Sequence, residues 1–256
     1  MRVKLLRLIS LPGLVLLGMI LPGRVGAQIV NIESILVDEP KDGVEGAVQI
    51  GFTLMEGNSE YRQLDGNGII RWKGGKHIFQ LVGGGSYKAA GAKKVADNSM
   101  GHFRYGYAVS DMVRLEVLLQ VQQNSFVQLN RRVLAGAGFR ANVLSSDAGR
   151  LDMGLILMHE DEVLNNSLSN PGWRASILLS AGWNLTPSAQ LSGQVYYQPL
   201  LSESGDFRIL NDTGLTVRVL GPLSLQVSFR LAHDSRPPEG VDTTDLSLRN
   251  SLAITF

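Results

Sequence analysis

Apolar and polar side chains alternate at every second position along most of the chain, in segments of about ten residues. The clearest case is "MVRLEVLLQVQ" at 112–122. Its odd-numbered positions from Val113 to Val121 are all apolar, whereas its even-numbered positions include Arg114, Glu116 and Gln120. Helical periodicity is almost absent. The pattern therefore predicts an all-β protein.

The alternating segments form a regular series along the chain. We place twelve strands at approximately 44–55, 60–72, 77–87, 99–109, 112–122, 131–144, 151–160, 173–185, 189–198, 207–220, 223–231 and 244–256. Odd-numbered connections are mostly long, such as "KAAGAKKVADN", and even-numbered ones are mostly tight, such as "KGGK" and "TPS". An even strand count with short turns at one end and long loops at the other is typical of outer-membrane β-barrels.

A soluble β-sandwich would also alternate, so the faces have to decide between the two folds. One face of the best strands carries no charge through its middle, where a charge in lipid would cost roughly 2–4 kcal/mol. Aromatic residues also gather at strand ends. Trp173 and Trp183 share a face, and their spacing corresponds to roughly 23 Å along the membrane normal, close to the apolar band of such barrels. The sequence thus favours a transmembrane antiparallel up-and-down β-barrel of about 12 strands, over residues 44–256.

The last segment, "TDLSLRNSLAITF", ends the chain on an aromatic residue. Leu252, Ile254 and Phe256 share one face of this strand. The final strand has to close the barrel, because an open sheet edge is not tolerated in lipid. We therefore interpret these three residues as a C-terminal insertion signal for the barrel assembly machinery.

The first 27 residues have the features of a cleaved signal peptide. Arg2, Lys4 and Arg7 precede an apolar stretch, and small residues lead to a cleavage site between Ala27 and Gln28. The alternative, a membrane anchor helix, is weakened by two prolines that bracket a short apolar run. Residues 28–43 are predicted to be a periplasmic lead-in segment. Together these features predict export to the outer membrane of a Gram-negative bacterium.

Charge and cysteine content narrow the function classes. Residues 1–27 hold four of the 24 basic residues and none of the 23 acidic ones, so the mature chain carries a net charge of −3. Nothing in this balance points to nucleic acid as a partner. The chain has no cysteine, so stability has to come from backbone pairing and packing. The expected partners are outer-membrane lipid and lipopolysaccharide, whose phosphates the basic "AGAKK" tip could meet.

Three stretches resemble the YdiY-like proteins, an uncharacterised outer-membrane family (domain of unknown function 481). "VEGAVQIGFTLMEGNSEYRQL" is similar to the family's first hairpin, "NRRVLAGAGFRANVLSSDAGRLDMGLILMHEDE" to its paired Gly-rich strands, and "HDSRPPEGVDTTDLSLRNSLAITF" to its closing hairpin. Some members are described as salt-induced. The resemblance implies an outer-membrane barrel with a structural or envelope-maintenance role and no established molecular activity.

The stretch "LAHDSR" is the sharpest enzymatic candidate. His233 and Ser235 continue the outward face of their strand, as in outer-membrane lipases that act at the rim. The third catalytic member is missing, since Asp245 is predicted to face the lumen and Asn250 lies too deep. His77, His102 and His159 lie on separate strands without ligand spacing. We therefore expect no enzyme activity, no metal site and no cofactor.

The predicted lumen face carries charges of both signs. Its candidate lining residues are Arg104, Arg114, Glu116, Arg140, Asp152, Glu160, Arg174, Arg208, Asp212, Arg218, Arg230, Asp245 and Arg249. In one interpretation these charges pair across a small lumen and fill it, leaving a structural barrel. In the other, an Arg-rich wall lines a narrow channel for small anionic solutes. Twelve strands lie between packed and open barrels, so strand number does not decide.

One segment breaks the alternation. In "DFRILNDTGLTVRVL", Asn211 and Thr213 fall on the predicted lipid face. Either a bulge near Ile209 and Leu210 resets the phase, or this part stands above the membrane.

Overall fold

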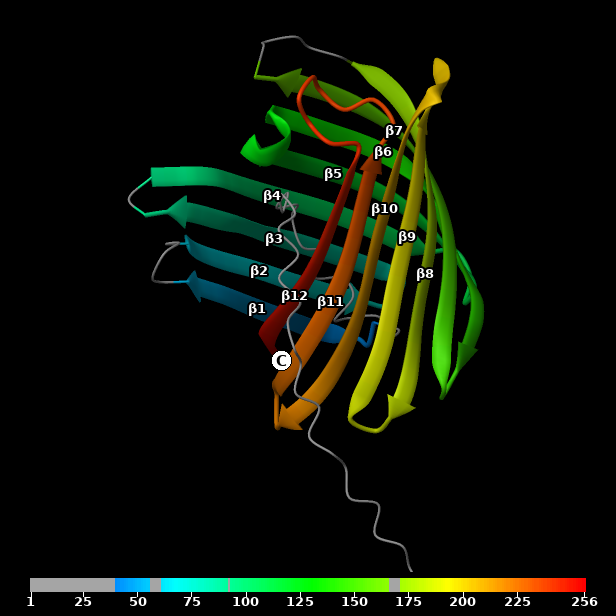
Figure 1. The fold of residues 1–256 in the computed structure, drawn as a ribbon. Helices are drawn as coiled ribbons and strands as arrows, with labels where there is room; N and C mark the ends of the chain where they lie inside the picture. The colour runs from blue at the N-terminus through cyan, green and yellow to red at the C-terminus, as the bar shows by residue number, and fades with distance from the viewer. Residues whose placement is uncertain (1–39, 56–60, 92, 166–170) are drawn as a thin grey trace, which may run out of the picture.

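The computed structural model describes residues 40–55, 61–91, 93–165 and 171–256 (Figure 1). The predicted signal peptide, with its cleavage site at Ala27 and Gln28, and most of the lead-in segment 28–43 lie outside these residues. No helix among the described residues is long and apolar enough to cross a membrane.

Antiparallel strands form a closed barrel in which each strand pairs with its neighbours in sequence and β12 meets β1. The strands are β1 (Gly43–Met55), β2 (Tyr61–Gly74), β3 (His77–Ala90), β4 (Lys93–Ala108), β5 (Val113–Asn124), β6 (Leu129–Ser146), β7 (Gly149–Leu164), β8 (Gly172–Thr186), β9 (Ala189–Leu200), β10 (Glu203–Leu220), β11 (Leu223–Asp234) and β12 (Thr244–Thr255). A short 3-10 turn, η2 (Ser125–Val127), follows β5. The predicted twelve-stranded all-β barrel is confirmed. We call the two ends the turn end, where β2–β3, β6–β7 and β10–β11 connect, and the loop end opposite it.

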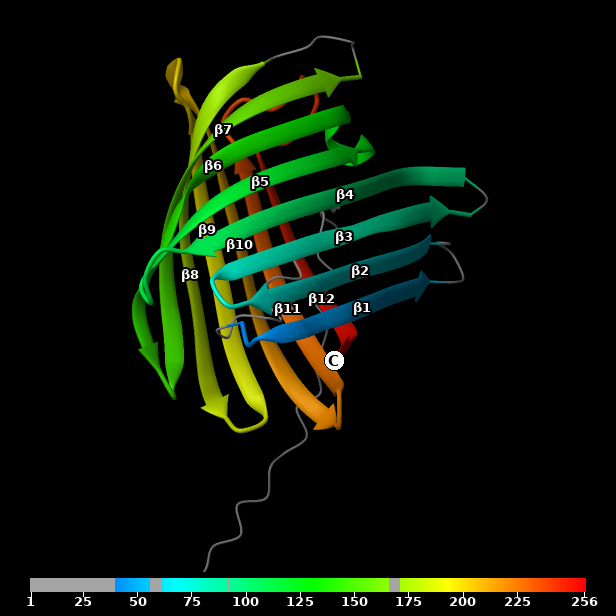
Figure 2. The same cartoon turned by 180° about the vertical axis from the view of Figure 1, so that it is seen from behind.

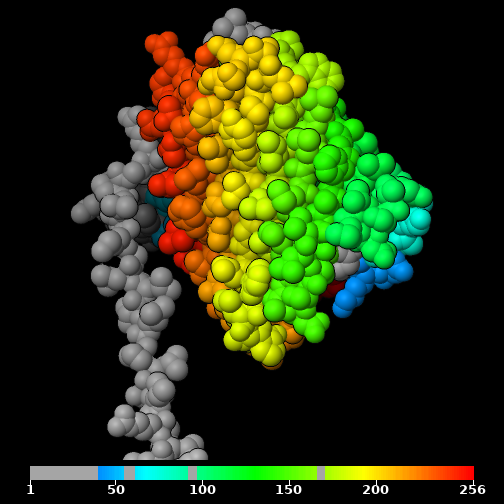
Figure 3. Space-filling model, turned by 90° about the vertical axis from the view of Figure 1, so that its right-hand side faces the viewer, coloured from blue at the N-terminus to red at the C-terminus, as the bar shows by residue number. Residues whose placement is uncertain are grey.

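Side-chain exposure separates the two faces of the wall. Outward apolar residues such as Leu119 and Leu157 are 48% and 47% exposed, whereas inward polar ones such as Arg174 and Gln226 are 2% exposed. A soluble sandwich has the opposite arrangement, with apolar residues inside. The predicted aromatic residues, including Trp173 and Trp183, are also exposed on the outside. Figure 3 shows this outer surface over the middle strands. The outer surface of the barrel is therefore apolar, as expected for a wall that faces membrane lipid.

The predicted long connection "KAAGAKKVADN" is wrong. The β3–β4 ladder continues through Tyr87↔Asp97 and Ala90↔Lys93, so the two strands form a long hairpin. Gly91 supplies the turn with a positive φ of 58°. Continued backbone pairing satisfies the amide groups that a long loop would leave to solvent, so polar composition alone misplaced the strand ends.

The phase of β10 is continuous through the segment that broke the alternation. Its register with β9 runs without interruption from Phe207↔Pro199 to Val217↔Ala189, so the proposed bulge near Ile209 and Leu210 is wrong. Asn211 and Thr213 remain on the outward side, and the Asn211 Nδ2 lies 3.3 Å from the Thr213 Oγ1. Mutual hydrogen bonding reduces the cost of holding two polar groups on this face.

The β1–β12 seam is paired only at its turn end. Backbone partners run from Ala47↔Thr255 to Ile50↔Leu252, and Gly46 and Phe256 exchange two hydrogen bonds of 2.8 and 2.9 Å. Inside the barrel, the Gln49 Nε2 donates to the Ser251 Oγ at 2.5 Å. Beyond these paired residues, the described residues 51–55 of β1 do not pair with β12, and the two strands diverge in both views (Figures 1 and 2).

Because the chain has no native cysteine, engineered pairs can test this seam directly. We expect Ala47→Cys with Thr255→Cys, which are direct partners, to form a disulfide under mild oxidation. The matched control, Thr53→Cys with Arg249→Cys, continues the same register into the diverging part and should stay reduced. The readout is mobility on a denaturing, non-reducing gel. Equal cross-linking of both pairs would show that the seam is paired along its whole length.

Candidate functional site

Three cavities follow one another along the lumen. The loop-end cavity, of about 230 Å³, and the central cavity, of about 40 Å³, share Arg104, Glu116 and Arg140 in their walls. The central cavity and the turn-end cavity, of about 410 Å³, share Arg114, Arg140 and Asp152 among their lining residues. Arg140 lines all three. The smallest of these cavities thus lies at one group of charged side chains, which also line its neighbours.

We call this group the constriction: Arg104 on β4, Arg114 and Glu116 on β5, and Arg140 on β6. The Glu116 carboxylate lies 2.9 Å from the Arg114 Nη2, 3.0 Å from the Arg140 Nε and 3.8 Å from the Arg104 Nε. Its side chain is only 1% exposed. Three guanidinium groups therefore share one carboxylate, which leaves an excess of positive charge where the cavities meet.

Glycines on the neighbouring strands make room for this arrangement. Gly106 and Gly138 are the direct partners of Glu116 on β4 and β6. A Cβ at Gly106 would lie 2.6 Å from the Arg114 Cδ, and one at Gly138 would lie 2.0 Å from the Leu155 carbonyl oxygen. The "GAG" stretch of β6 thus permits close approach of strands.

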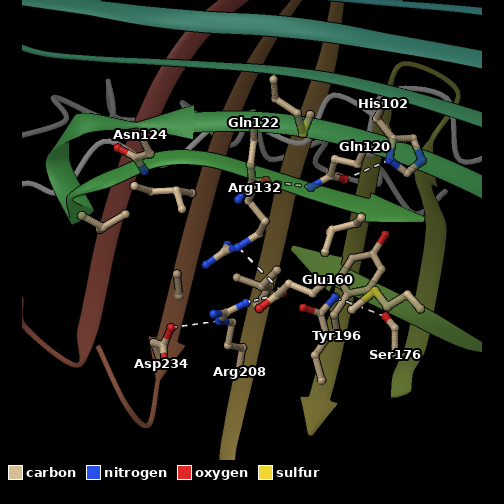
Figure 4. A pocket seen from close by; sticks show the side chains of 18 of the residues that line it. His102, Gln120, Gln122, Asn124, Arg132, Glu160, Ser176, Tyr196, Arg208 and Asp234 are labelled. Atoms are coloured by element: carbon tan, nitrogen blue, oxygen red, sulfur yellow. Dashed lines mark hydrogen bonds and ion pairs between the residues drawn. The ribbon is translucent and has the colours of Figure 1, made fainter. Parts of the chain in front are cut away.

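A second charged group, the loop-end network, contributes Arg132, Glu160, Glu162, Arg208 and Asp234 to the wall of the loop-end cavity (Figure 4). Arg208 is its centre, and its guanidinium lies 2.6 Å from Glu160, 3.0 Å from Glu162 and 2.8 Å from Asp234. Arg132 pairs with Glu162, and Arg174 with Asp206 at 2.7 Å. Here three guanidinium groups meet four carboxylates. In contrast to the constriction, this network is nearly balanced in charge and ties β6, β7, β8, β10 and β11 together.

The structure brings most of the predicted lumen residues into such groups. Arg104, Arg114, Glu116 and Arg140 form the constriction; Glu160, Arg174 and Arg208 belong to the loop-end network; Asp152 pairs with Arg150, Asp212 with Arg230, and Arg249 with Asp65; and Asp245 lines the loop-end cavity. Arg218 is the exception. It is exposed at the turn end of β10 and lines none of the three cavities described here.

Several charged residues of the lumen were not predicted. They are Glu45 and Arg71, which pair at 2.5 Å, and Asp65, Arg132, Arg150, Glu162, Asp206 and Asp234. Most of them lie beyond the predicted strand ends or in the less regular first strands. Extending each strand by one or two alternating pairs would have found Glu162 and Asp234.

His233 and Ser235, the candidate lipase pair, form hydrogen bonds with other groups. The His233 Nδ1 lies 2.8 Å from the Thr244 Oγ1. The Ser235 hydroxyl donates to the Gly205 carbonyl at 3.1 Å and accepts from the Phe207 amide at 2.8 Å. Ser235 thus joins the loop after β11 to β10, and its hydroxyl engages backbone groups of β10 while His233 engages Thr244.

The other histidines are dispersed over the wall. His77 lies 2.8 Å from the Tyr105 hydroxyl, His102 faces the lumen beside Gln120, and His159 packs edge-on against Trp173. Within the described part of the chain, no group of three or more His, Cys, Asp or Glu is arranged to hold a metal ion.

Solved structures with similar folds are outer-membrane barrels. The COG4313 outer-membrane channel from Pseudomonas putida F1 aligns with a TM-score of 0.51 at 9% identity. The alignment covers 90% of this chain and 100% of the channel. The translocator domain of the autotransporter NalP from Neisseria meningitidis (TM-score 0.48, 13% identity, 87% and 91% coverage) and the KdgM porin (0.45, 12%, 83% and 98%) are further examples. These identities support the fold alone.

No curated protein matches the sequence significantly. A family model does match, and it covers residues 48–256, nearly the whole barrel. This is the family that the sequence motifs resembled. The chain belongs to the DUF481 family of proteins of unknown function.

Proposed function

We propose that this protein is an outer-membrane channel for small anionic solutes, with the constriction as its selectivity filter. The observation that carries the proposal is the excess positive charge at the one place where all three lumen cavities meet. Rings of arginine or lysine favour anions in narrow pores, because field lines concentrate where the aqueous path is narrow and its walls are apolar.

Charges along the turn-end cavity also favour anions over cations. Lys73 and Lys76 line it together with Arg114, Arg140 and Arg150, whereas its lining includes only Asp111 and Asp152 as acids. An anion approaching from this side therefore meets a basic entrance before it reaches the constriction. Export through the signal peptide and insertion through Leu252, Ile254 and Phe256, with lipid and lipopolysaccharide around the barrel, remain part of this proposal.

The second candidate function is a structural barrel without solute flux. The loop-end network favours it, because Glu160, Arg174 and Arg208 are all at most 9% exposed and fill much of the lumen with paired charge. Such pairing stabilises a barrel without requiring a path through it.

Flux into proteoliposomes separates these two functions. We expect vesicles that contain the refolded protein to take up iodide faster than thallium, each followed with an ion-sensitive dye trapped inside. Vesicles with heat-denatured protein are the control. If iodide uptake matches that of the control, the channel proposal is wrong and the structural barrel is the better account.

A further inference from the structure

The lumen contains an apolar band that neither candidate function requires. The inward side chains Leu118 on β5, Leu134 on β6, Ile156 and Met158 on β7, Leu178 on β8 and Leu210 on β10 all line the loop-end cavity. Leu134, Ile156 and Met158 pack together as a buried cluster, with Leu118 against it. Lumens of outer-membrane barrels are normally polar, so an apolar band facing the cavity is unusual.

The band lies directly beside the constriction along the strands. Leu118 follows Glu116 at the next inward position of β5, and Leu134 precedes Arg140 by three inward positions on β6. Ile156 is the direct partner of Gly138, which itself faces Glu116. An apolar group resting on the band therefore lies within one to three inward positions of the excess guanidinium charge.

The polar groups that line the rest of the loop-end cavity favour one orientation of a ligand, with its anionic group toward the constriction. The loop-end network is nearly charge-balanced, since Glu160 and Glu162 engage Arg132 and Arg208. Tyr196 and Gln198 hydrogen-bond with Gln194 and Ser176 on the wall. An anionic group gains most at Arg104 and Arg140, where three guanidinium groups share Glu116. Pockets with an apolar lining and a few convergent charged groups suit ligands that match both features.

From these observations we infer that the loop-end cavity binds organic monoanions with an apolar body, such as aromatic or branched aliphatic carboxylates. This inference rests on the proposed channel function for transport, although binding to the cavity can be measured without it. The apolar body lies on the band of Leu118, Ile156 and Met158, and the carboxylate points to Arg104 and Arg140. Cavity size agrees, because about 230 Å³ accommodates a substituted six-membered ring.

Comparison of benzoate with acetate tests the inference, because both are carboxylates and only one carries an apolar ring. With the refolded protein in planar bilayers, we expect benzoate to compete with chloride current at roughly tenfold lower concentration than acetate. The double variant Ile156→Thr with Met158→Gln should bring the two concentrations close together, because it removes the apolar surface that distinguishes benzoate from acetate. The matched control, Leu155→Ala with Leu157→Ala, changes the adjacent outward positions and should keep the difference.

A second readout separates this inference from the proposed function. Saturation-transfer NMR with benzoate and the protein in bicelles reports binding without any flux. One informative outcome is a native protein that binds benzoate but carries no current, with binding lost in the Ile156→Thr, Met158→Gln variant. That outcome supports ligand binding in the loop-end cavity and overturns the proposed channel function. Chloride current with equal benzoate and acetate competition, and no saturation transfer to benzoate, overturns the inference and leaves the channel intact.

Discussion

Replacing Glu116 with glutamine is expected to lower the free energy of unfolding by about 3–5 kcal/mol. The substitution keeps the size of the side chain but removes the carboxylate that Arg104, Arg114 and Arg140 share. Three guanidinium groups then face one another at a site where the Glu116 side chain is only 1% exposed. An uncompensated buried charge costs far more than the net gain of an intact pair.

Urea unfolding of the protein in lipid vesicles, followed by tryptophan fluorescence, measures this change without adding salt that would screen charge. Asp161→Asn is the matched control. Asp161 lies 3.4 Å from Arg131 on the outside of the wall, with side-chain exposures of 38% and 57%. Its replacement should cost no more than about 1 kcal/mol. If Glu116→Gln costs as little as Asp161→Asn, the three arginines do not depend on the Glu116 carboxylate for compensation, and the description of the constriction as one coupled ion-pair group is wrong.

The strands were predictable because alternation and a lipid-facing surface impose a period of two along the whole wall. In β5 every outward residue from Val113 to Val121 is apolar, and the structure exposes those from Leu115 to Val121 as expected. The same phase placed Arg114 and Glu116 inward. The β3–β4 hairpin was misjudged because its outer part is rich in alanine and lysine, which carry little strand preference, while continued ladder pairing holds it extended.

The grouping of charged residues in the site could not be predicted, because it depends on the registers between strands, which the alternating pattern within each strand does not reveal. The contacts of Glu116 with Arg104 and Arg140 follow from the registers Gly106↔Glu116 and Glu116↔Gly138. Each register is set by the connection that joins the two strands, at some distance from Glu116. The inward position of Leu118 and Ile156 was evident from alternation. Their gathering into one band beside the constriction was not, because it requires the same registers. Likewise, a regular final strand gave no sign that the seam would pair over only part of its length.

Loss of one constriction arginine is expected to reduce anion preference strongly. Arg140 lines all three cavities, and its guanidinium stands 3.0 Å from Glu116. One unit charge a few ångströms from a passing ion contributes about 1 kcal/mol even in water, so Arg140→Gln should lower the chloride-to-potassium permeability ratio by roughly fivefold. Arg218→Gln is the matched control, since Arg218 is exposed at the turn end, outside these cavities.

The most direct test of the central claim is the reversal potential of the refolded protein in a planar bilayer under a potassium chloride gradient. We expect resolvable current steps and an anion-selective reversal potential. We further expect Arg140→Gln to move the potential toward zero, whereas Arg218→Gln should leave it unchanged. Absence of steps from the native protein, or identical potentials for native protein and Arg140→Gln, would contradict a channel filtered by this constriction.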